Sequence, residues 1–480
     1  MSEGANQSPE QTAPAGQSGS DTSSPPPVTG PWFQSIDWFG FGVTAVVILA
    51  VYLFTLAPEV TLRYSGILAT SAEYAGVAYP PGFPVWTVYS WLFVNLLPFS
   101  NIAWRVAVGS AVAAALASGL VALMVSRAGA MLLENTLAFT SRSPAQQRQL
   151  RVVCGFVAGV SLGLSRPVWS MAVVAETWAL AVMLYTVLTC LLLRWTGRPE
   201  QRRFLYGAFF VLGLMLTGNQ EQFVMVPALL LLALLNDREL GRDLSLVASF
   251  LAVADWGLSV VGLSYGPGSD MLQAAGLLLA FVLLGAAAVV VIVRTGRCGS
   301  EWLATALCVG VFLLGLGWYF YLPVASMTNP PVNWAYTRTA DGFLHGISRG
   351  QYERCHPTNE LGRLVQQLWL LVKEAGNGFG WLYLVFAALP LGVLGRTGRS
   401  ARNWLLGLAG AFLCVGPLMM TLLNPSADRA STDLIGPYFS AVAVVLALWT
   451  GLGLMVAGSI GTKARSFSGS DLRSQIASER

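Results

Sequence analysis

Long apolar segments recur along the whole of this 480-residue sequence. A helix needs about 20 mostly apolar residues to cross a bilayer. The segments that meet or approach this length lie near residues 38–57, 104–126, 152–166, 169–194, 204–218, 221–236, 244–264, 270–294, 302–323, 377–395, 403–423 and 436–458. Soluble proteins carry about 25% charged residues, whereas this chain carries 11%. The sequence therefore predicts an all-α polytopic membrane protein, a bundle of about twelve transmembrane helices.

The positions of the basic residues test this prediction without using hydropathy, because cytoplasmic loops of membrane proteins are rich in Lys and Arg. Most of the 28 Lys and Arg residues lie in alternate connections between the apolar segments, or after the last one. This alternation predicts an even number of spans in the plasma (inner) membrane, with both termini cytoplasmic. Two long connections, 57–105 and 325–376, then face the outside, and we call them the first loop and the late loop.

The two ends of the chain differ from the apolar middle. Residues 1–36 are polar, rich in Ser, Pro and Gly, and contain no Lys or Arg. Such a segment cannot bury enough apolar surface to fold, and it lacks the basic region of a signal peptide. We expect a disordered cytoplasmic tail over 1–36, a membrane domain over 37–460 and a second cytoplasmic tail over 461–480.

The sequence gives little support for metals, cofactors or nucleic acids as ligands. The six cysteines form no close pair, and only two histidines are present, so neither a disulfide framework nor a zinc site is indicated. No Gly-rich phosphate loop is visible. The net charge of +4 is not gathered into a basic stripe. We predict no metal, no cofactor and no nucleic-acid partner, and the lipid bilayer is the first expected partner.

The first loop is not built like a membrane span. It carries Glu59, Arg63 and Glu73, and a Tyr-Pro-Pro-Gly-Phe-Pro turn over 79–84 that precedes a run of aromatic residues. Two successive prolines cannot continue a helix, and Trp and Tyr prefer the boundary between membrane and water. We interpret this stretch as an interfacial loop with short helices that lie on the bilayer.

Several motifs of the chain, taken in order, resemble a bacterial family of membrane proteins related to the transmembrane protein O-mannosyltransferases. The motifs are APEVT, AGVAYPPGFPVW and LLPFSNIAWR in the first loop, then SRPVWSMAVVAETWAL, GLMLTGNQ and LPVASMTNPPVNWAYTRTADGFL. The resemblance covers most of the chain from about Trp38. It implies the GT-C architecture, a multi-span bundle with a large first outer loop. It also implies a polyprenyl-phosphate sugar donor and a protein hydroxyl as acceptor.

This chain departs from the family at positions that could carry acid–base chemistry. The family's Asp-Ser-Gly-Glu is here Tyr64-Ser65-Gly66-Ile67, its His-Pro-Pro-Gly begins here with Tyr79, and its Gly-Asn-His ends here with Gln220. Tyr has a pKa of about 10 and is a poor base at neutral pH. Two functions therefore stay open. One is a glycosyltransferase that transfers a sugar such as mannose, and the other is a catalytically degenerate relative that binds a lipid-linked sugar or a partner protein. A transporter is less favoured, because no internal repeat is visible.

Transfer to a hydroxyl needs a base for its proton and cationic or N–H donors for the departing phosphate. The remaining carboxylates of the first loop are Glu73, in an expected short helix, and Glu59, and we name both as candidate catalytic residues. Arg63 and Arg166 are the candidate phosphate ligands, since Arg binds phosphate bidentately. The plainer alternatives are solvated loop carboxylates, and arginines that reach lipid headgroups.

The other candidate substrate-binding residues belong to different outer segments: Tyr64 and Tyr79, Glu176, Asn219 and Gln220, then Asn333, Trp334, His345 and Arg349. Glu176 is expected one to two turns inside a span, where an acid is either functional or paired with a cation such as Arg166. A short helix from about Ala340 to Tyr352 would place His345 and Arg349 on one face, although it could equally be a solvated interfacial helix. We expect the 79–84 turn and Asn333 to meet over a cavity lined by Arg166, Glu176 and Gln220.

Overall fold

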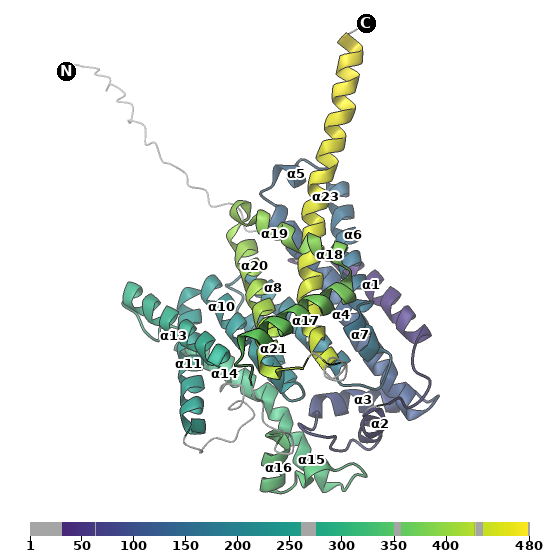
Figure 1. Ribbon diagram of the computed structural model, residues 1–480, viewed down its shortest axis with the longest axis vertical. Helices are drawn as coiled ribbons and strands as arrows, with labels where there is room; N and C mark the ends of the chain where they lie inside the picture. The colour runs from purple at the N-terminus through teal and green to yellow at the C-terminus, as the bar shows by residue number, and fades with distance from the viewer. Residues whose placement is uncertain are drawn as a thin grey trace, which may run out of the picture. The chain divides into compact units, whose positions relative to one another are not determined.

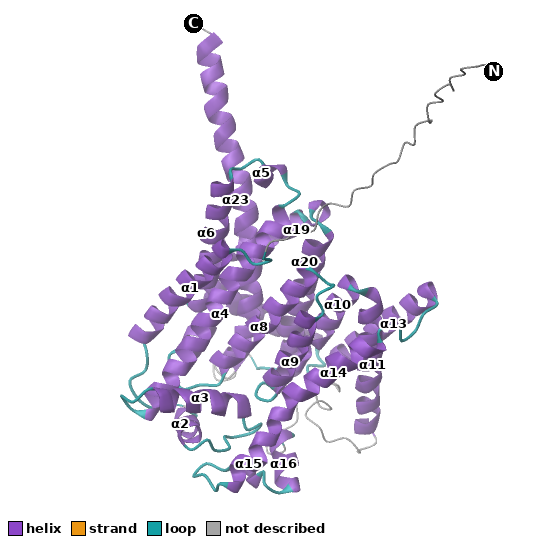
Figure 2. Ribbon diagram, turned by 180° about the vertical axis from the view of Figure 1, so that it is seen from behind, coloured by secondary structure: helices purple, strands orange, loops and turns teal. Residues whose placement is uncertain are grey.

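The structure is a computed structural model that describes residues 31–62, 64–260, 275–349, 357–426, 428 and 435–478. The chain divides into a short unit, Met1–Trp32, and a large unit, Phe33–Arg480. The described residues contain helices and no β-strand (Figure 2). The protein is therefore all-α, as predicted, and its apolar helices make it an integral membrane protein.

Seven helical stretches among the described residues are long and apolar enough to cross a membrane, or nine if each of two bent helix pairs is one span. Two more apolar helices, Arg203–Leu216 and Gln220–Asn236, are shorter. Each of the twelve predicted segments overlaps a helix, but the number of spans stays a prediction. The predicted span at 244–264 is one example. The helix observed there, Arg238–Val260, begins with charged residues, and the predicted end of the span at residue 264 lies outside the described residues.

The first half of the chain forms a bundle around one long buried helix (Figure 1). Its helices, in order, are α1 (Ser35–Phe54), α2 (Ser65–Glu73), α3 (Pro84–Leu96), α4 (Ile102–Leu133), α5 (Leu137–Thr140), α6 (Pro144–Gly163), α7 (Arg166–Ala172), α8 (Trp178–Gly197) and α9 (Arg203–Leu216). The central helix is α4, which packs against α1, α6 and α8 and is buried along most of its length.

Small residues bring α6 close to α4. A Cβ atom added to Gly155 would lie 2.6 Å from the carbonyl oxygen of Ala122, and one added to Gly159 would lie 2.5 Å from that of Ser118. The next glycine of this stripe, Gly163, faces α1 and accepts a hydrogen bond of 2.7 Å from the Tyr52 hydroxyl through its carbonyl oxygen. Small residues at four-residue intervals allow such close packing of membrane helices.

The second half continues with η1 (Gln220–Met225), α10 (Val226–Asn236), α11 (Arg238–Val260), α13 (Ala275–Thr295), α14 (Trp302–Leu316), η2 (Gly317–Phe320), α15 (Tyr321–Met327), η3 (Trp334–Tyr336) and α16 (Ala340–Ile347). The last part contains α17 (Leu361–Phe379), α18 (Trp381–Val385), η4 (Phe386–Ala388), α19 (Leu389–Gly392), η5 (Leu394–Arg396), α20 (Arg399–Leu413), η6 (Cys414–Leu418), α21 (Met419–Leu423), η7 (Gly436–Tyr438) and α23 (Phe439–Ser478). Most of the predicted tail over 461–480 is thus a continuation of α23.

The first loop and the late loop lie at one end of the bundle, where α2, α3, α15 and α16 are close together in both views (Figures 1 and 2). We call this the loop end. Short helices were predicted in the first loop, and α2 and α3 are the helices found there. At the far end of α1, Asp37 is fully buried and accepts hydrogen bonds of 2.5 Å from both Arg151 and Ser126.

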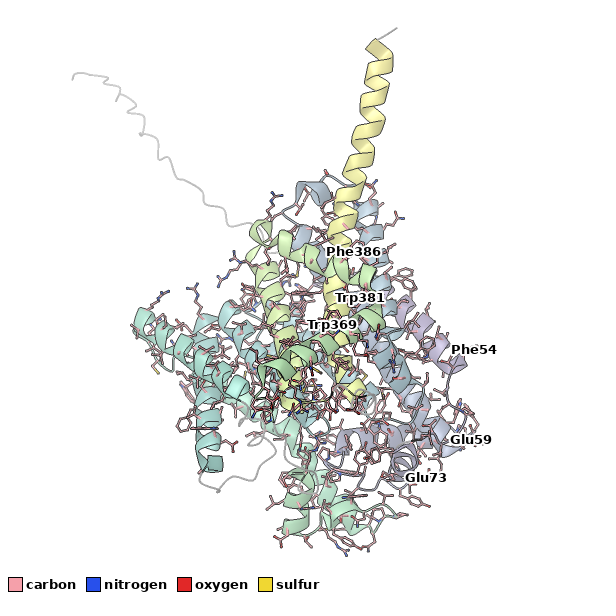
Figure 3. All side chains as sticks on the ribbon, viewed as in Figure 1. Phe54, Glu59, Glu73, Trp369, Trp381 and Phe386 are labelled. Carbon is pink, nitrogen blue, oxygen red and sulfur yellow. The ribbon has the colours of Figure 1, made fainter. Side chains whose placement is uncertain are left out.

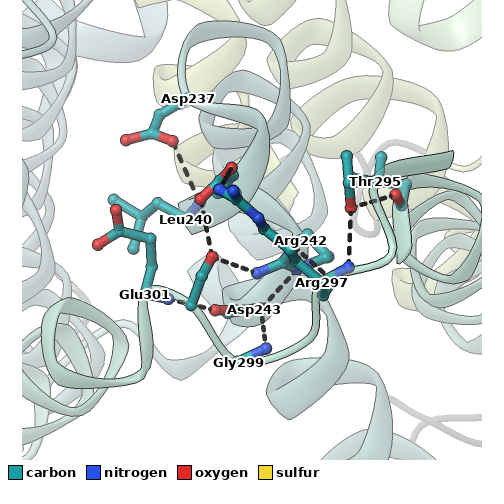
Figure 4. A network of polar contacts seen from close by, with 11 residues as sticks. Asp237, Leu240, Arg242, Asp243, Thr295, Arg297, Gly299 and Glu301 are labelled. Atoms are coloured by element: carbon teal, nitrogen blue, oxygen red, sulfur yellow. Dashed lines mark hydrogen bonds and ion pairs between the residues drawn. The ribbon is translucent and has the colours of Figure 1, made fainter. Parts of the chain in front are cut away.

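A second network of charged groups joins the residue before α9, the start of α11 and the connection before α14. Figure 4 shows its part around Arg242 and Asp243. The guanidinium of Arg202 holds Glu301 with two hydrogen bonds of 2.6 and 2.9 Å. The fully buried Arg242 donates to the neighbouring Asp243 at 2.7 Å, and Asp243 also accepts from the Glu301 N–H at 2.8 Å. These pairs stabilise the end of the fold at which α14 begins.

Candidate functional site

The first loop and the late loop touch through their backbones at the loop end. Val77 and Asn333 form a parallel bridge, in which the Val77 N–H donates to the Val332 carbonyl at 3.0 Å and the Trp334 N–H donates to the Val77 carbonyl at 3.2 Å. The Tyr321 hydroxyl adds a bond of 2.5 Å to the Ala75 carbonyl. The first loop and the late loop therefore meet, as predicted, but the contact is at Val77, just before the 79–84 turn. Neither that turn nor Asn333 lines the cavity that holds Arg166 and Glu176, so the predicted meeting over this cavity is wrong.

The 79–84 turn is a packed aromatic unit. The Tyr79 ring lies 4.5 Å from the ring of Tyr64 and 5.0 Å from that of Phe83, measured between centroids. Phe83 and Trp86 are buried in a hydrophobic cluster with Leu68 of α2. The Trp86 indole donates a hydrogen bond of 3.0 Å to the Glu176 carbonyl, so the first loop is fastened to the connection between α7 and α8.

That connection corrects the prediction for Glu176. We expected a continuous span over 169–194, but α7 ends at Ala172 and α8 begins only at Trp178. The short helix α7 is bent by 66° from α6, because Ser165-Arg166-Pro167 starts a new helix with proline in its first turn. Glu176 therefore lies in a break between helices, where it is 8% exposed.

This break forms part of a cavity of about 390 Å³. Its walls come from the first loop, α7, α17 and the start of α23. Arg166, Glu176 and Glu374 bring charge to the lining, and Leu62, Met171 and Phe439 are among its apolar residues. The cavity thus combines one guanidinium with two carboxylates beside an apolar wall, which suits a ligand with a phosphate and hydroxyl groups.

Gln220 does not line this cavity, and the prediction that it would is wrong. Its amide nitrogen instead donates two hydrogen bonds of 2.7 Å, to the Tyr319 hydroxyl and to the Ile347 carbonyl. Asn219 donates to Glu221 at 3.1 Å, and the Arg349 guanidinium lies 3.7 Å from the same carboxylate. The buried Asn219, Gln220 and Glu221 and the partly exposed Arg349 therefore form a separate cluster that holds the late loop against η1.

The late-loop helix is shorter than predicted. It ends at Ile347, and Arg349 follows in a left-handed backbone conformation with φ +57°. His345 is exposed on α16, so the expected shared face of His345 and Arg349 does not form. Trp334 is 40% exposed beside the bridge. Asn333 donates to the Ser326 carbonyl at 3.2 Å through its amide nitrogen.

The two predicted catalytic carboxylates lie elsewhere in the first loop. Glu59 is exposed in the turn after α1, and Glu73 is the last residue of α2. In Figure 3 both lie well away from Trp369 on α17, and neither lines the cavity that holds Arg166. The Oε2 atom of Glu73 is nevertheless buried, with no hydrogen-bond partner in the described part of the chain. Arg63 lies outside the described residues.

Sequence reasoning missed Glu374, which shares the cavity with Arg166 and Glu176. The sequence predicts a loop that extends to residue 376 with one short helix near Ala340, whereas α17 fills Leu361–Phe379. The alternation of apolar and polar residues at helical spacing in LGRLVQQLWLLVKEAGNGF could have revealed this helix. Within the described residues, no group of three or more His, Cys, Asp or Glu could hold a metal ion.

These features define a class: an integral membrane protein with a charged cavity at the loop end. Known proteins resemble the part of the chain that contributes Arg166 and Glu176 to this cavity. Residues 65–241 match the family model "Protein O-mannosyl-transferase TMEM260 N-terminal domain". The mouse (Mus musculus) Protein O-mannosyl-transferase TMEM260 is 29% identical over 233 residues, which is 47% of this chain and 30% of the mouse protein. The chain thus matches less than a third of that relative's length. No solved structure gives a significant match.

Proposed function

We propose that this protein is a membrane glycosyltransferase of the GT-C type. It moves a sugar, mannose being the first candidate, from a polyprenyl-phosphate donor to an acceptor such as a protein hydroxyl on the outer side. Its setting is a bacterial inner membrane, with both termini cytoplasmic. The similarity of residues 65–241 to a protein O-mannosyl-transferase supports this reaction class. The observation that carries the proposal is the cavity with Arg166, Glu176 and Glu374.

The cavity residues divide the chemistry between them. Arg166, at the start of α7, binds the donor phosphate and stabilises the charge that develops as the sugar leaves. Glu374 takes the proton of the acceptor hydroxyl, the role of a general base. Glu176 positions the acceptor or the sugar by accepting hydrogen bonds from hydroxyl groups. The apolar wall with Leu62, Met171 and Phe439 accommodates the isoprenoid end of the donor.

The first loop supplies the competing base. Glu73 retains this candidacy because a buried carboxylate oxygen without a protein partner in the described part of the chain is costly, and an acceptor hydroxyl would satisfy it. Glu59 is the weaker candidate, since it is exposed. The remaining proposed substrate contacts come from both loops and the η1 cluster: Arg63, Tyr64, Tyr79, Asn219, Gln220, Asn333, Trp334, His345 and Arg349.

One observation favours a second function, a binding protein without catalysis. Tyr64 and Tyr79 occupy the positions at which the resembled family has Asp and His. In this structure their rings pack against each other at a tilt, with centroids 4.5 Å apart. Two titratable groups are thus replaced by one tilted aromatic pair, which offers an apolar surface for a sugar ring. In this case the protein holds a lipid-linked sugar or a partner protein and transfers nothing.

Turnover of the donor distinguishes the two functions. Purified protein in lipid vesicles is given radiolabelled polyprenyl-phosphate mannose and a set of hydroxyl acceptors, including Ser- and Thr-rich peptides. Wild type should transfer the label, and Glu374→Gln should lower the rate by about 10²–10⁴-fold, the range for loss of a general base. Glu73→Gln and Glu59→Gln test the competing bases, Arg166→Gln should weaken donor binding, and Glu360→Gln is the matched control at the start of α17.

Two outcomes would change the assignment. Donor binding by wild type without transfer to any acceptor would replace the enzyme with the binding protein. Full activity of Glu374→Gln together with loss in Glu73→Gln would move the base to the first loop. Loss of donor binding in Arg166→Gln but not in Arg338→Gln, an exposed arginine of the late loop, would support the cavity as the donor site.

A further inference from the structure

The helix α17 presents three distinct sectors around its axis. At 3.6 residues per turn, Leu361, Val365, Trp369 and Val372 fall within an arc of about 80°. These four side chains are 77%, 59%, 63% and 44% exposed, so the bundle does not cover this arc. An arc of large apolar side chains is unfavourable in water, because the cost of hydrating apolar surface grows with its area.

A second sector fastens the helix to the bundle. Gln367 is 2% exposed and donates through its amide nitrogen to the side chain of Asn424 at 3.0 Å and to the Pro425 carbonyl at 3.2 Å. Leu371 is 3% exposed and packs against Gly416. Glu374 and Gly378 lie on the same side and line the cavity with Arg166. The orientation of α17 about its own axis is therefore fixed by contacts.

The third sector, between the other two, is polar and exposed. It contains Arg363, Gln366 and Lys373. The polar sector and the apolar arc meet along the length of the helix, as in helices that lie in the plane of a membrane surface with one side in acyl chains and the other in water. The two cations are placed to meet phosphate headgroups.

The apolar arc continues onto the next helix. The chain turns by 110° between Leu361–Phe379 and Trp381–Arg396, and Gly376 allows the corner because an added Cβ would lie 2.4 Å from the Trp381 ring. Trp381, Leu382 and Val385 after the corner are 53%, 80% and 64% exposed. Figure 3 shows Trp369 on α17 and Trp381 just beyond the corner. The exposed arc thus runs into apolar surface of the membrane-crossing part of the protein.

From these observations we infer that α17 lies in the boundary between lipid and water, with Leu361, Val365, Trp369 and Val372 in the acyl chains. This orientation places Glu374, on the opposite side of the helix, at the depth of the lipid headgroups. The cavity with Arg166 then opens at the level at which a lipid phosphate sits. The inference does not depend on sugar transfer, and it holds equally for the binding protein.

Spin labels measure this orientation directly. The native cysteines are replaced by alanine, and single cysteines are introduced at Val365, Trp369, Gln366 and Lys373 for labelling in phosphatidylcholine–phosphatidylglycerol vesicles. Collision with oxygen, which concentrates in acyl chains, should exceed collision with a water-soluble nickel complex at 365 and 369. The order should reverse at 366 and 373, which are matched controls on the same helix.

Each other result would overturn the inference. Greater access of the nickel complex at 365 and 369 would mean that the arc faces water. Protection of these sites from both reagents would mean that protein covers the arc. The wild-type chain, with its cysteines intact, provides a second measurement that does not depend on the variants. A lipid with a photoactivatable group in its acyl chain should label peptides containing Val365 to Val372, and absence of label there would count equally against the proposal.

Discussion

The two ends of α1 bury polar groups in opposite ways. At its first turn, the Asp37 carboxylate has no exposed surface and is held by Arg151, Ser126 and the N–H of Gln34. At the loop end, the Glu73 Oε2, Gln220 Oε1 and Asn333 Oδ1 atoms are buried, with no hydrogen-bond partner in the described part of the chain. The Asp37 carboxylate is satisfied within the protein, whereas these three atoms at the loop end are spare acceptors.

This difference separates a structural role from a binding role. A buried charge is tolerated when a partner neutralises it, and removal of the partner is strongly destabilising. A buried acceptor without a partner costs about 1–3 kcal/mol. Such groups are rare in folded proteins, and the three at the loop end are therefore candidates for atoms whose missing donors a ligand supplies.

The largest effect is expected when the ion pair between Asp37 and Arg151 is broken. Arg151→Met leaves Asp37 buried without its cation and should destabilise the protein by about 3–5 kcal/mol. The measurement is reversible unfolding in mixed micelles. The double variant Asp37→Asn with Arg151→Met is the control, because it removes both charges and should recover much of the loss. A single variant as stable as wild type would show that Asp37 does not depend on its ion pair.

A smaller effect is expected where the two loops touch. A Cβ atom at position 76 would lie 2.6 Å from the Val332 carbonyl oxygen, a backbone atom that cannot rotate away. Gly76→Ala should therefore separate the Val77–Asn333 bridge and cost about 1–3 kcal/mol, as overpacking does. It should also make the late loop more sensitive to limited proteolysis, which gives a local measurement.

Gly66→Ala is the matched control for this substitution. It lies in α2, and its nearest neighbour would be Val60 Cγ1 at an ordinary 3.6 Å. Alanine is the better helix former by about 1 kcal/mol, so this variant should be neutral or slightly stabilising. Equal melting temperatures for the two variants would show that the loops are not in contact at Gly76.

The apolar pattern predicted the helices well, because a bilayer demands long apolar stretches whatever the neighbours are. It could not predict the partner of Asp37, since Arg151 lies 114 residues away and no local spacing connects the two. The break around Glu176 was also missed, because Ala172 to Ala175 are as apolar as the helices on either side. Side-chain pairing and helix breaks depend on packing that composition does not record.

The candidate site was predictable where turn chemistry marks a segment. The prolines of the 79–84 turn and the Asn-Pro-Pro stretch before Asn333 pointed to two rigid loops, and these loops meet. The sequence could not show that Gln220 turns toward Tyr319 rather than the cavity, because an amide at a helix start is compatible with both. Glu374, the carboxylate that shares the cavity with Arg166, was missed because its helix was predicted to be part of a loop.

The smallest expected effect concerns pH and the second satisfied network. Hydrogen bonds from Arg202 hold the pKa of Glu301 below its usual value, and they outweigh the opposing effect of burial. A carboxyl group with a lowered pKa in the folded state contributes stability above its unfolded pKa, about 4.3. That contribution disappears as the pH falls through the lower pKa that Glu301 has in the folded state. The pair is partly exposed, so we expect a loss of about 1 kcal/mol or less on acidification.

Glu301→Gln tests this expectation, because glutamine keeps the shape but does not titrate. The variant should be slightly less stable than wild type at pH 7, and the two proteins should approach each other in stability as the pH falls below about 4. Asp341→Asn, on the exposed first turn of α16 at the loop end, is the comparison variant and should follow wild type throughout. If Glu301→Gln instead parallels wild type at every pH, the Arg202 pair contributes nothing to stability.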